Sequence, residues 1–108
     1  MDEIEELVEI FKSLADPTRL RLVKLLGEQA PHNCPSQCNG ESFLCVNALA
    51  HKLGVTQSAV SQHLRVLRQA GLVRGRRHGS FMHYSLDKDG LEKYKVALRE
   101  TLGADFME

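Results

Sequence analysis

Residues 56–84 read TQSAVSQHLRVLRQAGLVRGRRHGSFMHY, and this stretch predicts a capped helix followed by a β-hairpin. Thr56 is a favourable N-cap residue, and Gly71 marks the end of the helix. Three apolar side chains recur at helical spacing and should face a core: Val60, Leu64 and Leu67. We therefore expect an amphipathic helix with one buried face and one polar face.

The second half of this stretch is expected to be a basic hairpin. Residues 72–76 and 81–86 predict two short strands joined by a turn at 77–80, where Gly79 can supply a positive φ. The whole stretch carries five arginines, three histidines and no carboxylate, whereas the 108-residue chain has zero formal net charge. The positive charge is therefore local, which indicates one defined surface for a polyanion.

Helices are expected on both sides of this stretch. Apolar residues three and four apart predict them over residues 2–15, 17–28, 46–53 and 88–102. Asp16 and Asp87 can cap two of these helices, and Pro17 suits a first helical position. Residues 30–42 predict a loop from their Pro, Asn, Gly and Ser content. The order ααααββα is mainly α with a β-hairpin wing, a winged helix-turn-helix in a single domain of residues 1–108.

The DNA-reading unit is expected over residues 44–86. Helix 46–53, a turn at Gly54-Val55 and the next capped helix form a helix-turn-helix pattern. Polar side chains gather on the exposed face of the second helix: Gln57, Ser58, Ser61, Gln62 and Arg65. A glutamine side chain can form two hydrogen bonds to adenine, and serine can form hydrogen bonds to several base edges. Arginine can form hydrogen bonds to guanine or to a phosphate. Since the first turns of such a helix enter the major groove, short polar groups would read the bases.

The hairpin adds basic side chains beside this helix and suits backbone or minor-groove contact. The predicted DNA contacts are Thr56, Gln57, Ser58, Ser61, Gln62, His63, Arg65, Arg74, Arg76, Arg77 and His78. A solvated polar helix beside an incidental basic hairpin is the competing interpretation, but spacing, caps, wing and absence of acid together favour DNA binding. For His63 a packing or capping role competes with a phosphate contact. His51 and His83 are expected to be structural or solvated rather than ligands.

Composition excludes several classes of protein. Hydrophobic residues make up 43% and charged residues 26%, as in ordinary globular proteins. No apolar run approaches the ~20 residues of a membrane span, and the acidic N-terminus does not resemble a signal peptide. We therefore expect a cytoplasmic protein with no membrane partner. Its small core favours a partner subunit.

FKSLADPTRLRLVKLL (11–26) resembles the second-helix signature of the ArsR/SmtB family of prokaryotic winged-helix repressors. LCVNALAHKLGVTQSAVSQHLRVLRQAGLVRGRRHGSFMHYSL (44–86) is similar to the DNA-binding core and wing of that family. The resemblance covers most of the chain. It implies a homodimer built on the first and last helices, which binds a palindromic operator of double-stranded DNA and leaves it when an inducer binds. The apolar stripes over 4–14 and 91–102 favour a homodimer independently.

Three cysteines with the spacing C-x3-C-x6-C are candidate ligands: Cys34, Cys38 and Cys45. Thiolates are soft ligands, and three of them suit trigonal As(III), Sb(III) or Pb(II). With His32 as a fourth ligand they would make a tetrahedral site for Zn(II) or Cd(II). Because Cys45 lies at the start of helix 46–53, an ion that joins it to the preceding loop would be linked to the DNA-reading unit.

The resemblance to metalloid sensors is partial. Those relatives look like LCVC where this chain has Leu44-Cys45-Val46-Asn47, so Asn47 stands in place of the second cysteine. A second family site, on the last helix, is not expected, because the comparable positions are Lys88, Gly90, Thr101 and Ala104.

Alternatives for the cysteines are a thiol-redox or reactive-sulfur switch and a structural zinc loop. An enzyme such as a thiol oxidoreductase is disfavoured, because no base is positioned to activate a thiol. We therefore expect a repressor that a soft ion releases from its operator.

Overall fold

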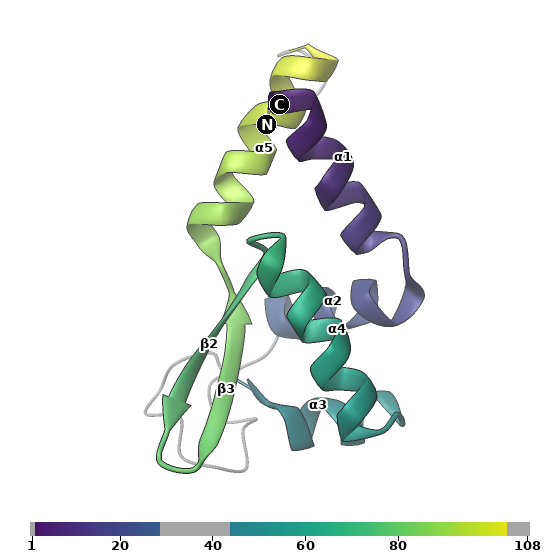
Figure 1. Ribbon diagram of the computed structural model, residues 1–108, viewed down its shortest axis with the longest axis vertical. Helices are drawn as coiled ribbons and strands as arrows, with labels where there is room; N and C mark the ends of the chain where they lie inside the picture. Colours follow the sequence, from purple (N-terminus) through teal and green to yellow (C-terminus); the bar gives the residue numbers. More distant parts are fainter. Residues whose placement is uncertain (1, 29–43, 104–108) are drawn as a thin grey trace.

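The computed structural model describes residues 2–28 and 44–103, and these form a winged helix-turn-helix (Figure 1). The elements in chain order are α1 (Glu3–Leu14), α2 (Pro17–Glu28), β1 (Leu44–Cys45), α3 (Val46–Leu53), α4 (Gln57–Gln69), β2 (Val73–His78), β3 (Phe81–Leu86) and α5 (Lys88–Leu102). The mainly α fold with a β-hairpin is confirmed. The loop predicted at 30–42 lies outside the described residues.

Side-chain caps fix the starts of three helices where the sequence predicts them. The carboxylate of Asp16 accepts the backbone N–H of Arg19 at 3.1 Å, just before α2. The hydroxyl of Thr56 accepts the backbone N–H of Ala59 at 3.1 Å. The carboxylate of Asp87 accepts the backbone N–H of Gly90 at 3.1 Å. Each cap satisfies a backbone donor that the first helical turn leaves without an intrahelical partner, which explains why these boundaries are readable locally.

The hairpin turn is shorter than the sequence predicts. Strand β2 pairs with β3 from Val73↔Leu86 to His78↔Phe81, so that Gly79 and Ser80 alone connect the strands. Gly79 adopts a φ of +61°, as a two-residue hairpin loop requires. The prediction of a turn over 77–80 is therefore wrong at its start, because cross-strand pairing extends to the last residue before the glycine.

A third strand, β1, was not expected. It pairs antiparallel with β3, which gives the sheet order β1-β3-β2 and places Cys45 opposite His83. The two residues Leu44–Cys45 are too few for a period-two pattern, so the sequence carries no local signal for this strand. Its effect is to tie the start of α3 to the wing.

The core lies under the helix-turn-helix. Its fully buried apolar side chains are Leu22, Leu49, Val60, Leu64, Leu67, Leu72 and Val73. The predicted inward face of α4 is thus confirmed at all three of its positions. Burial of such side chains is the main term that holds α4 in place, at about 1.5–3 kcal/mol for each large one.

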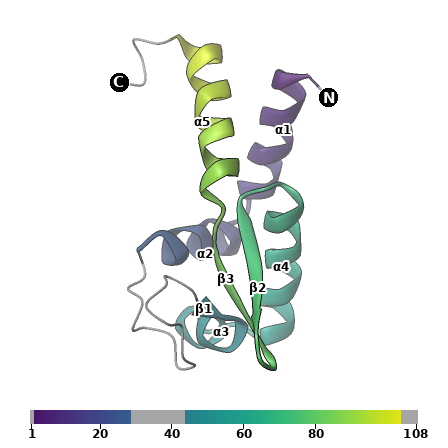
Figure 2. The ribbon, with the colours of Figure 1, turned by 90° about the vertical axis from the view of Figure 1, so that its left-hand side faces the viewer.

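The molecule is elongated, with extents of 42 × 26 × 22 Å. Helices α1 and α5 lie side by side at one end of the long axis, whereas α3, the start of α4 and the hairpin turn lie at the other (Figures 1 and 2). Of the helices in the described ranges, none is long and apolar enough to cross a membrane.

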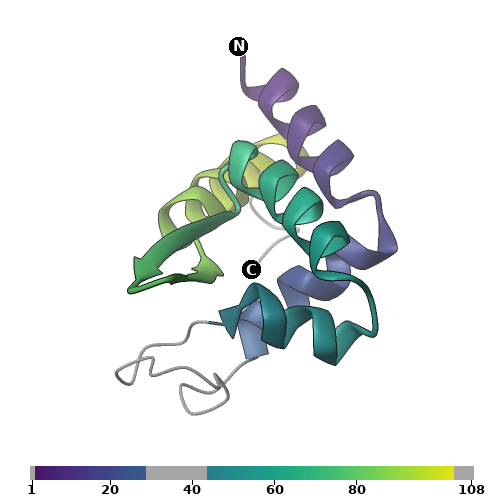
Figure 3. The same ribbon diagram turned by 60° about the horizontal axis from the view of Figure 1, so that its bottom comes forward.

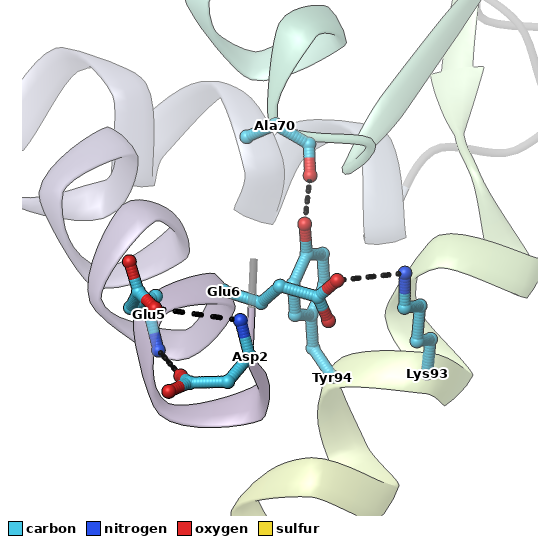
Figure 4. A network of polar contacts seen from close by, with 6 residues as sticks. All are labelled: Asp2, Glu5, Glu6, Ala70, Lys93 and Tyr94. Atoms are coloured by element: carbon cyan, nitrogen blue, oxygen red, sulfur yellow. Dashed lines mark hydrogen bonds and ion pairs between the residues drawn. The ribbon is translucent and has the colours of Figure 1, made fainter.

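Polar contacts join α1 and α5 to each other and to the end of α4 (Figure 4). Lys93 of α5 lies 3.4 Å from the carboxylate of Glu6 of α1, and the Tyr94 hydroxyl donates to the carbonyl of Ala70, which caps α4. Asp2 and Glu5 form a capping box at the start of α1. A hydrogen bond between carboxyl groups of α1 and α5, from Glu3 to Glu100, raises the pKa of Glu3. Through Tyr94, α5 is tied to the end of α4.

Candidate nucleic-acid interface

Helices α3 and α4 form the predicted helix-turn-helix (Figure 3). Gly54 ends α3 in the left-handed conformation, and Thr56 then starts α4. The buried face of α4 packs on the core, which turns the opposite face outward. The start of α4 and the hairpin turn point to the same end of the molecule, so they can meet one duplex together.

The polar side chains of α4 are exposed as predicted. The exposed residues at its N-cap and on the predicted reading face are Thr56, Gln57, Ser58, Ser61, Gln62 and Arg65, and near its end Arg68 and Gln69 are exposed as well. The six residues of the reading face offer hydrogen-bond donors and acceptors, and Arg65 is the only charged residue among those six. A surface of this kind suits the donor and acceptor pattern of base edges better than a uniformly charged one.

The wing carries exposed cations next to this face. Arg74, Arg76 and Arg77 are exposed on β2, and His78 ends that strand next to the turn. Arg74 and Arg76 share one face of the strand by its period of two, and Arg77 lies on the other. The arginines can therefore reach phosphates on both sides of the wing.

A hydrogen bond between α3 and α4 lies on the same surface. The Gln57 side chain donates from Nε2 to Oδ1 of Asn47 at 2.9 Å, and both residues are exposed. In the sequence, Asn47 stands out only as the residue that replaces a cysteine of the relatives. One signal in the sequence could have pointed to Asn47. It is a polar residue at the start of the first helix of a helix-turn-helix, and it lies ten positions before a glutamine that is expected to read bases.

His63 is directed toward the start of α2 rather than only toward solvent. Its Nδ1 lies 3.3 Å from a guanidinium nitrogen of Arg19, its Nε2 lies 4.0 Å from Asp16, and its side chain is 23% exposed. The backbone N–H of Arg19 lowers the pKa of the Asp16 carboxyl, and the charges of His63 and Arg19 lower it further. The contacts of His63 thus fit a packing role, and its phosphate contact stays a prediction.

The start of α1 is acidic, whereas α4 and the wing are basic. Exposed arginines are carried by α4 and by the wing, whereas three glutamates occupy the first turn of α1. Like-charge repulsion would keep the acidic end away from a phosphate backbone. The field therefore favours one orientation on DNA.

Of the predicted cysteine ligands, Cys45 falls within the described residues. It precedes α3 as its N-cap, is 4% exposed and faces His83, which is 0% exposed, across the sheet. Cys34, Cys38 and His32 lie outside the described residues, and within residues 2–28 and 44–103 no three His, Cys, Asp or Glu side chains are grouped to hold a metal. The buried thiol of Cys45 is a soft donor at the junction of the wing and α3, which fits one ligand of a soft-ion site.

Apolar side chains are exposed at the end formed by α1 and α5. They are Ile4, Val8, Phe11, Val96 and Leu102. Leu7 and Ile10 of α1 face inward instead, so this helix has one apolar face in the core and another in solvent. Such a second face is typical of a surface that another subunit covers.

Proteins with similar sequences or structures are transcriptional regulators. The family described as bacterial regulatory protein, arsR family, matches residues 36–74. A helix-turn-helix transcriptional regulator of Bacillus subtilis is 33% identical over 90 residues, which cover 82% of this chain and 90% of that protein. A solved structure described as a possible transcriptional regulator for arsenical resistance is 38% identical, with a TM-score of 0.64, and the match covers 83% of this chain and 80% of that chain.

The arsenical resistance operon repressor of Escherichia coli is 40% identical over 79 residues. These residues cover 73% of this chain and 57% of that repressor, so the chain spans little more than half of its length. The relatives and the fold are those of regulators and not of enzymes.

Proposed function

This chain belongs to the ArsR family of winged-helix transcriptional regulators, and we propose that it is a homodimeric repressor released from a palindromic operator by a soft metal or metalloid ion. The observation that carries the proposal is the exposed polar face of α4 beside the basic wing, at one end of the molecule. Base reading then belongs to the start of α4. The wing arginines would attract the phosphate backbone of the DNA.

The homodimer rests on the exposed apolar side chains of α1 and α5. Phe11 is 51% exposed although it is large and apolar, and Val8 and Ile4 continue its row along α1. Covering this surface with a second copy would remove apolar area from water. A two-fold pair of recognition helices would then read half-sites about 10–10.5 bp apart, or a multiple of that spacing.

We infer the class of inducer from the cysteines and from the names of the relatives. The descriptions of two similar proteins name arsenical resistance. This favours a thiophilic ion as the inducer. We propose Cys34, Cys38 and Cys45 as its ligands, with His32 as the candidate for a fourth. The candidate ions are As(III), Sb(III), Pb(II), Cd(II) and Zn(II), which thiolates bind well. The described part of the site supports this proposal through Cys45, because this residue directly precedes α3 and pairs with the wing strand β3.

A thiol switch is the alternative within the same class. Oxidation of the cysteines to a disulfide would release DNA without any metal. A structural zinc loop is a further alternative, in which the metal supports folding and does not signal.

Operator binding titrated with separate effectors tests the proposal. The purified chain would first select its operator from a randomised duplex library, and affinity would then be measured with As(III), Cd(II), Pb(II), Zn(II) or an oxidant added in turn. We expect release by at least one thiophilic ion under reducing conditions. Release by oxidant alone would favour the thiol switch, and failure to select any duplex would refute a DNA-binding function.

A further inference from the structure

The hydrogen bond between Asn47 and Gln57 restricts how the glutamine amide can face DNA. Gln57 occupies the first position of α4, where a recognition helix meets base edges. Its Nε2 donates to Oδ1 of Asn47 at 2.9 Å, and Asn47 is the second residue of α3. Two exposed side chains from different helices are thus joined on the surface that would meet the major groove.

The chemistry of the amide makes this bond informative. A glutamine side chain has two N–H donors on Nε2 and an acceptor at Oε1. Asn47 takes one of the two donors, so the other donor and Oε1 are left for the groove. One donor beside one acceptor complements adenine, which presents an acceptor at N7 and a donor at N6. Guanine presents two acceptors at this edge and would leave the amide oxygen facing another oxygen.

We propose that Asn47 is a positioning residue that orients the Gln57 amide to read adenine in each half-site. The proposal rests on the proposed DNA-binding function. It adds a residue of α3 to the specificity of the repressor and states which base Gln57 recognises. Asn47 acts through Gln57 and needs no base contact of its own.

The test compares base preferences of the whole chain and its variants on a randomised duplex library. The variants are Asn47→Ala, Gln57→Ala, the double variant and Asn47→Asp, with His51→Ala as a control. His51 is exposed on the same helix and takes no part in the proposed reading surface. Thermal unfolding of each variant shows whether a change in binding comes from loss of fold.

We expect Gln57→Ala to abolish the preference at one half-site position, where the wild type selects adenine. Asn47→Ala should weaken the same preference about fivefold or more, the lower end of what one bidentate contact contributes. In the double variant the loss should not exceed that of Gln57→Ala alone. Asn47→Asp keeps an acceptor oxygen, so it should keep the preference while its negative charge weakens binding to every duplex. His51→Ala should match the wild type.

Three results would overturn the inference while leaving the repressor function intact. They are an unchanged preference in Asn47→Ala, a base other than adenine at the position that Gln57 reads, and a double variant whose losses add. Additive losses would mean that Asn47 contacts DNA by itself. A wild-type chain that selects no sequence would refute this inference together with the proposed function.

Discussion

At the residue scale, base reading and phosphate attraction are expected to separate onto different side chains. Gln57→Ala or Ser61→Ala should reduce discrimination by about 1–3 kcal/mol where the side chain makes a bidentate bond to a base. Arg76→Ala or Arg77→Ala should instead weaken binding to all sequences. The logarithm of the binding constant should then fall less steeply with the logarithm of the salt concentration, by about 0.9 in slope for each phosphate that is no longer neutralised. Affinities for operator and unrelated duplex, measured at several salt concentrations, check both. A change of specificity in Arg77→Ala with none in Gln57→Ala would reverse the assigned roles.

Asp16 makes stability depend on pH in the acid range. Its pKa is lowered below the ordinary value of 3.8, first by the backbone N–H of Arg19, so the folded state favours the charged carboxylate. A depressed pKa contributes stability that is present above about pH 4 and is lost as the pH falls through the folded pKa. Asp16→Asn keeps an acceptor for that N–H but loses the charge.

We therefore expect wild type to be more stable than Asp16→Asn at neutral pH, with a difference that shrinks below about pH 4. Urea unfolding of both proteins from about pH 7 to about pH 3 measures it. A difference that stays constant across this range would show that the charge of Asp16 contributes nothing.

At the element scale, the start of α5 packs unusually closely on the turn after α4. A Cβ placed on Gly90 would lie 1.8 Å from the carbonyl oxygen of Gly71, far closer than two non-bonded atoms can approach. Replacing glycine by alanine inside a helix usually stabilises by about 0.8–1 kcal/mol. Gly90→Ala should reverse that sign and lower the free energy of unfolding, because α5 must shift away from the turn.

Gly27→Ala is the matched control, since Gly27 is also helical and, among the residues that the structure describes, its added Cβ would meet only the side chain of Leu86 at 3.4 Å. We expect this variant to be neutral or slightly stabilised. Urea midpoints of the two variants and the wild type give the comparison. A stabilised Gly90→Ala would mean that α5 does not need its close approach to the turn.

At the scale of the whole molecule, the exposed apolar face of α1 should hold the dimer together. Phe11→Glu should give a monomer at micromolar concentration with weak operator binding, because a charge replaces apolar surface. Leu20→Glu on α2 is the control, since Leu20 is 52% exposed and apolar but lies outside the proposed surface. Sedimentation and operator binding of both variants check the prediction. A monomeric wild type with full operator affinity would contradict the dimer.

The cysteine switch also belongs to this scale, since it must act from one end of α3 on the DNA-reading unit. Changing Cys34, Cys38 or Cys45 to Ser should leave operator affinity nearly unchanged and blunt release by the inducing ion. Cys45 should matter most, because it directly precedes α3. Serine suits an N-cap position, so this substitution should cost little stability.

A structural zinc loop predicts the reverse for the same three variants. Melting temperature and operator affinity would then fall together in each of them. Release like that of the wild type in all three would remove the cysteines from the mechanism.

Local signals in the chain were enough to predict the helices, their starts and the polar face of α4. Caps at Asp16, Thr56 and Asp87 act within three residues of themselves, and an amphipathic stripe repeats every turn, so both are visible in a linear chain. The local excess of arginine over carboxylate in 56–84 is equally visible. The caps and stripes are local signals because the backbone hydrogen bonds of a helix join residues only four apart.

Which distant residues meet depends instead on how the elements pack. Strand β1 pairs with β3 and brings Cys45 opposite His83, His63 packs against Asp16, and Asn47 reaches Gln57 across the helix-turn-helix. None of these pairs leaves a periodic trace in the sequence, because each depends on how the buried faces of separate elements fit together. The orientation of the Gln57 amide is therefore a property of the fold, whereas the presence of a polar reading face is a property of the chain.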